Sequence, residues 1–415
     1  MRDLFRDSRL VVATALIMAI GLLDGFEALV LGLLAPAIGR DLNIALPFFT
    51  WIFFATSVGT MSGSMLAGLL ADRYGRRKVL IMAALAMAVG MIGDGLSPNW
   101  EVLLIARAFA GMGLGAVLPA GTTLIAELAP VRYRAAIISV IVVSTTIGGA
   151  SSAFSIHLME RLTDWRGIFI AAGVLSAVIA LAMYFWLPES PTFLAKGAAE
   201  AQNGERNDAQ KSTRGATIMR VFAEGRAVGA LILCLFFFSY YIWLGFHRSW
   251  GPLVYGAEGA NLAAGRTSMA LYGTGVIAGA ALAPILALRW REQTIIKLAL
   301  AVGGLCLVAL ATAGGTSGTP FTVLWLLAGC SLYLPFQLGY GVATSYFPAH
   351  SRSMGVALVA VCGRLGSLSG PLFGGALVAV QSSSQTILIA AALPIALAFA
   401  VLLGLRLSTK GSSAA

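Results

Sequence analysis

The stretch GLLADRYGRRK, residues 68–78, joins two long apolar runs near residues 50–71 and 79–97. Gly75 suits a tight turn, because glycine adopts backbone conformations that other residues avoid. The basic residues around it can cap helix ends and pair with acidic groups. Such positive charge is typical of a cytoplasmic loop between two membrane-spanning helices. A charged loop with no further role is the simpler alternative.

The composition around this stretch excludes a soluble domain. Hydrophobic residues make up 58% of the 415 residues, charged residues only 11%, and the mean hydropathy is +0.86. A helix that crosses a bilayer needs roughly 20 apolar residues, and the chain supplies about twelve such runs. The predicted spans are 11–34, 50–71, 79–97, 101–124, 135–158, 167–187, 228–250, 267–288, 295–314, 320–342, 353–378 and 385–407.

The net charge of +10 would suggest nucleic acid in a soluble protein, but here it follows the alternation of loops. With the N-terminus inside, most of the 28 Lys and Arg residues fall in loops on the cytoplasmic side. The positive-inside rule therefore predicts an inner-membrane protein with both termini cytoplasmic. The first apolar run is too long for a cleavable signal peptide and lacks a small-residue cleavage site.

One polar segment, residues 191–226, divides the spans into six and six. The sequence therefore predicts a six-helix bundle over residues 1–190, a cytoplasmic linker over 191–226 and a second bundle over 227–415. A faint repeat relates the halves, because Arg134 and Arg352 each precede a glycine-rich stretch at the same spacing. Two related bundles with a site at their interface form a common transporter plan.

The stretch from Gly68 to Lys78 resembles the loop signature between helices 2 and 3 of the major facilitator superfamily. Residues 107–115 resemble that superfamily's helix 4 motif, and LPESP at 187–191 is another ending found there. The resemblance implies an all-α membrane protein with twelve transmembrane helices in two six-helix bundles. It implies that conformational gating depends on Gly68, Asp72, Arg73, Gly75, Arg76 and Arg134.

Within that superfamily the chain is most similar to the aromatic acid:proton symporters. The similarity lies in DGFE at 24–27, WGP at 250–252, RSMG at 352–355, and GRLG and GP at 363–366 and 370–371. It implies import of an aromatic carboxylate together with protons. The family pattern in the first motif is Asp-Gly-x-Asp, and Glu27 departs from it with a longer reach.

Ionisable side chains inside a membrane span cost roughly 3 kcal/mol each and usually mark function. Asp24, Glu27, Arg107 and Arg364 stand out. At about 1.5 Å per residue, Asp24 and Arg107 lie at nearly the same depth, and Asp24 and Glu27 share a helix face. We predict that these three couple transport to protons, with Asp24 the first choice as carrier. A purely structural salt bridge is the alternative.

Arg364 is a deep cation in the second half, where no Asp or Glu falls inside a predicted span. Its predicted partner is the substrate's carboxylate, and binding to backbone carbonyls near Gly363 and Gly366 is the alternative. Aromatic side chains could complete the pocket, because their rings can stack on a ring-bearing acid. The candidate substrate-binding residues are Arg364, Phe26, Tyr240, Trp243, Phe336 and Tyr340.

The sequence contains no cofactor fingerprint, metal site or recurring catalytic group, so we expect neither an enzyme nor a cofactor. The leading prediction is proton-coupled import of a benzoate-like acid by alternating access, with no catalytic residues. Import of a non-aromatic organic acid, proton-driven drug export and a membrane sensor of the same fold are the alternatives. The expected partners are a small organic anion, protons and the lipid bilayer, and we expect a monomer.

Overall fold

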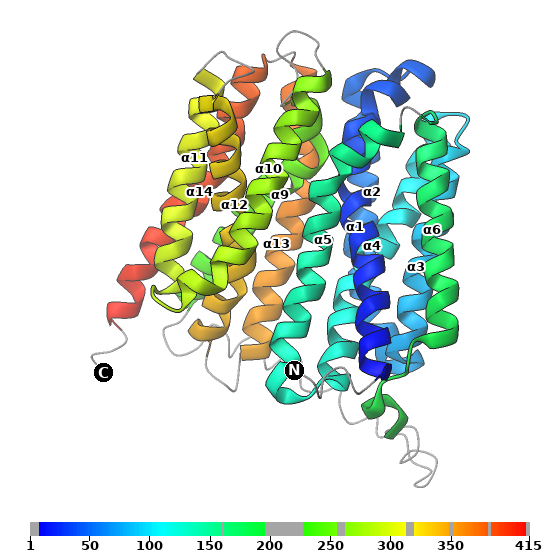
Figure 1. Cartoon of the computed structure of the whole chain (residues 1–415). Helices are drawn as coiled ribbons and strands as arrows, with labels where there is room; N and C mark the ends of the chain where they lie inside the picture. Colours follow the sequence, from blue (N-terminus) through cyan, green and yellow to red (C-terminus); the bar gives the residue numbers. More distant parts are fainter. Residues whose placement is uncertain are drawn as a thin grey trace. The chain divides into compact units, whose positions relative to one another are not determined.

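The structure is a computed structural model that describes residues 8–159, 162–195, 227–254, 262–312, 319–347, 352–380 and 383–411. Within those residues, twelve helices are long and apolar enough to cross a membrane, as the sequence predicts. Figure 1 shows them as long rods that run side by side within each half of the chain.

Every predicted span corresponds to one helix, and most helices extend a few residues beyond the apolar run. In the first half these are α1 Ser8–Asp41, α2 Phe49–Tyr74, α3 Arg76–Gly95, α4 Trp100–Leu128, α5 Val131–Met159 and α6 Trp165–Trp186, with the short 3-10 helix η2 Leu46–Phe48 before α2. In the second half they are α9 Ala227–Val254, α10 Leu262–Ala287, α11 Glu292–Thr312, α12 Thr319–Tyr346, α13 Arg352–Ala379 and α14 Ser384–Gly411. The extensions arise because a helix keeps its backbone hydrogen bonds after the side chains turn polar.

The chain divides into two compact units, unit 1 from Met1 to Arg206 and unit 2 from Asn207 to Ala415. The division falls inside the segment for which the sequence predicts a linker. Residues 196–226 of that segment lie outside the described residues, so the linker remains a prediction.

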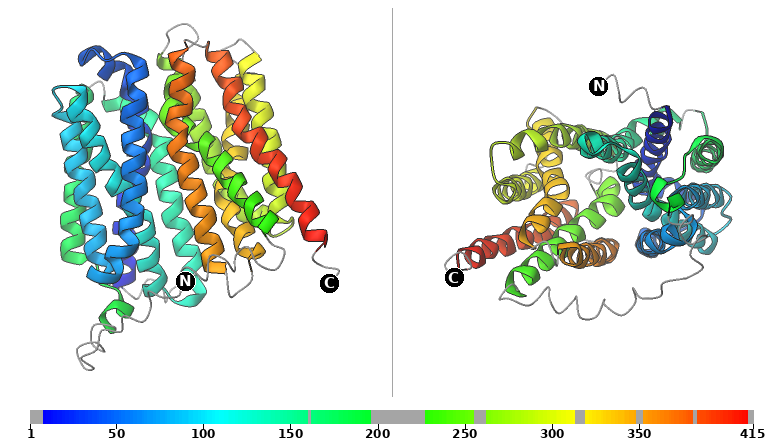
Figure 2. Two further views of the ribbon diagram at one scale, coloured as in Figure 1. Left: turned by 180° about the vertical axis from the view of Figure 1, so that it is seen from behind. Right: turned by 90° about the horizontal axis from the view of Figure 1, so that it is seen from below.

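The two units share one internal packing pattern. In unit 1, α1 packs against α5, α2 against α4, and α3 against both α4 and α6. In unit 2 the corresponding pairs are α9 with α13, α10 with α12, and α11 with both α12 and α14. The end-on view in Figure 2 shows each unit as a bundle. The same arrangement in both halves is what an internal repeat produces.

Glycines allow the helices of unit 1 to approach closely. A Cβ added to Gly25 of α1 would overlap the backbone of Thr145 in α5, and one on Gly111 of α4 would overlap Thr56 of α2. Small residues at such contacts bring backbones together in membranes. We call the end of unit 1 where α1 begins, α2 meets α3 and α6 ends the Gly75 end. The opposite end is the Asp41 end.

Candidate functional site

Three charged side chains from three helices meet inside unit 1. Arg107 of α4 donates through Nη1 to Oε1 of Glu27 on α1, at 2.5 Å, and through Nη2 to Oδ2 of Asp94 on α3. All three residues are buried, with Glu27 2% exposed and the other two 0%. We call Glu27, Asp94 and Arg107 the buried triad.

The buried triad leaves three polar atoms without a hydrogen-bond partner among the described residues: Oε2 of Glu27, Oδ1 of Asp94 and Nε of Arg107. The Arg107 guanidinium also lies over the ring of Phe169 on α6, with Cζ 4.6 Å from the ring centroid. The aromatic face stabilises the cation and shields it. Because Oε2 of Glu27 and Oδ1 of Asp94 are unpaired within the residues described, each carboxylate has an oxygen that could bind a proton.

The packing of α3 on α4 explains why Asp94 faces Arg107. These helices form an antiparallel hairpin through residues 96–99. A Cβ on Gly93 would lie 3.1 Å from the Cβ of Ala106, and one on Gly90 would overlap Ala110. This register places Asp94, in the last turn of α3, opposite Arg107 of α4.

The structure changes the predicted carboxylate pair. Asp24 and Glu27 were expected to surround Arg107, but the carboxylates that contact it are Glu27 and Asp94. Asp24 is half-buried and has another interaction within the protein. Sequence reasoning did not single out Asp94, although it falls inside the predicted span 79–97. The signal that could have found it is a carboxylate inside a predicted span, because such residues usually mark function.

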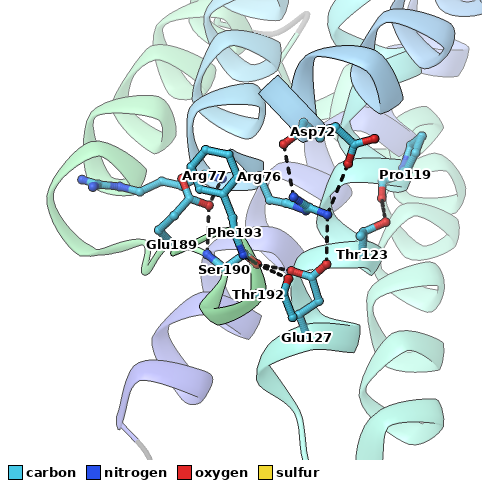
Figure 3. A network of polar contacts seen from close by, with 11 residues as sticks. Asp72, Arg76, Arg77, Pro119, Thr123, Glu127, Glu189, Ser190, Thr192 and Phe193 are labelled. Carbon is cyan, nitrogen blue, oxygen red and sulfur yellow. Dashed lines mark hydrogen bonds and ion pairs between the residues drawn. The ribbon is translucent and has the colours of Figure 1, made fainter. Parts of the chain in front are cut away.

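A second polar network lies at the Gly75 end and centres on Arg76 (Figure 3). Nη2 of Arg76 lies 3.2 Å from Oε1 of Glu127 on α4 and 3.4 Å from Oδ1 of Asp72. The other oxygen of Glu127 accepts a hydrogen bond from Ser190, which follows α6. Three helix ends are thereby joined. Arg76 and Glu127 are largely buried, with side chains 15% and 16% exposed, whereas Asp72 is 75% exposed.

Glu189 holds the turn between α2 and α3 from the opposite side. Its Oε1 accepts from the backbone N–H of Arg77, at 3.1 Å, and from that of Ser190, at 2.9 Å. Gly75 has a φ of +93°, and a Cβ there would overlap the Glu189 carboxylate. The turn thus needs glycine for both its backbone angle and its space.

The other predicted gating residues differ in their surroundings. A Cβ added to Gly68 would meet no atom within 4 Å, so this glycine makes no close helix contact. Arg73 is exposed, with its guanidinium 5.3 Å from the ring centroid of Tyr74. Arg134 is half-buried near the start of α5. The structure therefore brings Asp72, Gly75 and Arg76 together at one turn. Gly68, Arg73 and Arg134 lie outside the hydrogen bonds of that turn.

Unit 2 contains an aromatic cluster between α9 and α12. The Tyr241 hydroxyl donates to the Tyr340 hydroxyl at 3.5 Å, and the Tyr241 and Phe336 ring centroids are 6.4 Å apart. These three side chains are half-buried, and we call them the open aromatic group. Tyr240 and Trp243 are fully covered, and Tyr240 donates to the Leu332 carbonyl at 2.7 Å. The Tyr240 ring packs against that of Tyr241, with centroids 5.6 Å apart, and Trp243 packs against Tyr240 at 5.8 Å.

Arg364 lies on α13, and the residue before it, Gly363, packs against the open aromatic group. A Cβ on Gly363 would be 3.3 Å from the Tyr241 ring. Arg364 is half-buried and has an interaction within the protein. Phe26 packs against the core of unit 1. The expectation that no acidic residue belongs to a span of the second half needs correction, because α11 begins at Glu292.

These features define a class of protein. In the described part of the chain, twelve apolar helices form two units of like packing, with ionic groups buried inside a helix bundle. This arrangement is that of a multi-pass membrane protein of the kind that moves solutes. Among the described residues, no group of three or more His, Cys, Asp or Glu could hold a metal ion.

Comparison with known proteins identifies the family. A model of the Major Facilitator Superfamily matches residues 16–342, and the chain belongs to that family. The inward-open xylose transporter XylE from Escherichia coli has the same fold, with a TM-score of 0.74 at 17% identity over 96% of this chain and 95% of that one. The chain is accordingly a multi-pass inner-membrane transporter and not an enzyme.

Several relatives are similar over almost their whole length. A gallate transporter of Pseudomonas putida is 28% identical, over 86% of this chain and 83% of the relative. The 4-hydroxybenzoate transporter PcaK of Pseudomonas aeruginosa is 27% identical, over 92% and 89%. The 3-(3-hydroxy-phenyl)propionate transporter of Escherichia coli is 27% identical, over 93% and 91%.

Proposed function

We propose that this transporter imports a small aromatic carboxylate together with protons, by alternating access. The observation that carries the proton coupling is the burial of Glu27 against Arg107 inside a membrane-spanning bundle. The substrate class rests on the three relatives, each named for a hydroxylated aromatic acid.

Electrostatics explains why an importer of anions needs protons. Moving one negative charge inward against an inside-negative potential costs about 2.3 kcal/mol per 100 mV. One proton per carboxylate makes the step neutral, and a further proton allows accumulation. A carboxyl group that binds a proton on one side of the membrane and releases it on the other supplies this coupling.

Of the two predicted carriers, Glu27 contacts Arg107, so it is the first carrier in this proposal and Asp24 is the second. Protonation of Glu27 removes its negative charge and weakens its hold on the guanidinium. That change would alter how α1 is held against α4. A transporter that rocks between two states can use such a difference to favour one of them.

The substrate's carboxylate is proposed to bind Arg364, and its ring to bind the open aromatic group. A guanidinium recognises a carboxylate through two parallel hydrogen bonds, and aromatic rings stack on each other. The support is the packing of Gly363, next to Arg364, on Tyr241. Because Arg364 already has an interaction within the protein, the substrate would share it or replace its partner.

We place the Gly75 end on the cytoplasmic side, with both termini and the 191–226 linker, because the basic residues gather there. The ion pair between Arg76 and Glu127 holds α3 against α4 at that end, and its rearrangement would change how the end is packed. Asp72, Arg73, Gly75 and Arg134 lie around the same end and are proposed to set this equilibrium. We propose that the monomer is the working unit.

Uptake into proteoliposomes tests the proposed function. The probes are radiolabelled gallate, 4-hydroxybenzoate and 3-(3-hydroxyphenyl)propionate, with xylose and a sugar acid for comparison, each with and without an inward proton gradient. We expect gradient-stimulated uptake of at least one aromatic acid and none of xylose. Stimulated uptake of the sugar acid alone would replace the aromatic substrate with a non-aromatic one. Uptake that ignores the gradient would contradict proton coupling.

A further inference from the structure

The buried triad contains one carboxylate more than its single guanidinium can neutralise. Glu27 and Asp94 each use one oxygen on Arg107, and the second oxygen of each is buried without a hydrogen-bond partner among the described residues. With both carboxylates ionised, the group would carry a net charge of −1 out of contact with water. Burial of an uncompensated charge is unfavourable, and an unpaired buried oxygen adds to the cost.

One proton removes both problems. We propose that Glu27 and Asp94 hold a single proton between them, so that Asp94 is the second half of the proton-binding group. This inference rests on the proposed function for its role in transport. The proton forms one O–H bond to Oε2 of Glu27 or Oδ1 of Asp94, and no other bond changes. It leaves to water when the bundle opens to solvent, and the group then carries its negative charge.

No neighbouring side chain among the described residues supplies a second positive charge to the buried triad directly. On α6, Arg166 donates to the carbonyls of Gly95 and Ser97, close to Asp94, but it is already paired with Asp41 at 3.0 Å. Asp24, one turn earlier on α1, adds another negative group.

The other charged groups on the packed helices lie towards the ends of the bundle. Glu101 is exposed at the start of α4. The Asp and Arg side chains of α2 and α5, and the Arg and Lys side chains of α3, lie at the Gly75 end. The proton is therefore the simplest source of neutrality for the triad.

Removal of either carboxylate gives a specific result under this proposal. In Asp94→Asn, Arg107 and Glu27 form a neutral ion pair, so Glu27 no longer needs a proton. In Glu27→Gln, Arg107 and Asp94 do the same. A salt bridge that is only structural would lose stability in these variants, but it would show no shared loss of a protonated carboxyl group.

Infrared titration of the purified full-length protein in lipid detects protonated carboxyl groups directly and needs no substrate. We expect a carboxylic acid C=O band in the wild type that persists above the pH at which exposed carboxyls ionise. Both Asp94→Asn and Glu27→Gln should lose it. Asp41→Asn, which makes the same change at the exposed ion pair with Arg166, should retain it.

Other outcomes overturn the proposal. These are a wild type with no such band, or a band that survives in Asp94→Asn. A band that only Asp24→Asn removes would assign the proton to Asp24 instead. If Asp94→Asn does not fold, Asp94→Glu replaces it. That variant keeps the charge and should shift the band frequency, and an unshifted band contradicts the proposal.

The titration separates this inference from the proposed function. If both variants lose the band but no aromatic acid is taken up, the proton shared by Glu27 and Asp94 is supported and the proposed substrate is rejected. Proton-driven aromatic acid uptake by a wild type without the band would keep the function and reject the pair. In Asp94→Asn, counterflow should survive, whereas accumulation driven by a proton gradient should fall to the level of Glu27→Gln.

Discussion

The hydroxyl of Tyr241 on α9 lies 3.5 Å from the hydroxyl of Tyr340 on α12, and both rings are half-buried. The two helices thus present phenol rings side by side, with Phe336 against Tyr241. A planar acid could stack there without displacing Tyr240, which is fully covered.

Replacement of the Tyr340 ring should weaken binding of an aromatic acid. Tyr340→Phe keeps the ring, and we expect less than about a threefold change in Kd. Tyr340→Leu removes it and should raise Kd about tenfold, because a stacked aromatic pair contributes about 0.5–1.5 kcal/mol. Calorimetric titration with 4-hydroxybenzoate measures both. Phe185→Leu, on the exposed face of α6, is the control and should leave Kd unchanged. Equal Kd values for Tyr340→Leu and the wild type would exclude this ring from the site.

Substitutions of Arg364 should separate a charge effect from a geometric one. Arg364→Ala should raise Kd for the acid by about a hundredfold or more, and Arg364→Lys by about tenfold, because lysine lacks the planar two-pronged donor. Arg352→Lys, at the start of the same helix, should bind normally. Binding of the acid by Arg364→Ala at the wild-type Kd would show that the partner of Arg364 lies within the protein alone.

Gly75 and Gly68 should respond differently to alanine. Gly75→Ala forces a side chain into a φ of +93° and into the Glu189 carboxylate, so it should cost about 1–3 kcal/mol of stability. Gly68→Ala meets open space on α2 and should be neutral or stabilising, because alanine favours helix over glycine. Thermal unfolding in detergent compares the two Tm values. A Gly75→Ala protein as stable as Gly68→Ala would contradict this account of the turn.

Cysteine labelling tests the proposed orientation. Lys78 and Asn99 are exposed at opposite ends of α3 and its following turn. A membrane-impermeant maleimide should label Asn99→Cys in intact cells and Lys78→Cys only after the membrane is opened. The parent protein, with two buried and two half-buried cysteines, gives the background. The reverse pattern would place both termini outside.

The twelve helices were predictable because each needs a long apolar run, and α3 and α6 end within two residues of the predicted spans. The turn at Gly75 was also predictable from local sequence, because a glycine between two apolar runs indicates a tight turn. Its partner Glu189 was not, because the contact joins residues far apart in the sequence.

The buried triad shows where such reasoning stops. Depth along a helix could not choose between Asp24 and Glu27, because three residues span only about 4.5 Å. The choice depends on which side of α1 faces α4, and there Glu27 is buried while Asp24 is half-exposed. Asp94 was missed because it stands beside the Ser-Pro-Asn turn and resembles a loop residue. Only the register of α3 on α4 brings it to Arg107.

The most direct test of proton coupling compares two kinds of transport in one variant. Gradient-driven uptake needs net proton movement, whereas counterflow exchanges substrate without it. In Glu27→Gln proteoliposomes we predict that 4-hydroxybenzoate no longer accumulates in response to an inward proton gradient, while counterflow continues. Asp24→Asn is measured beside it and should retain part of the accumulation. Full proton-driven accumulation in both Glu27→Gln and Asp24→Asn would contradict the account and leave these carboxylates a structural role alone.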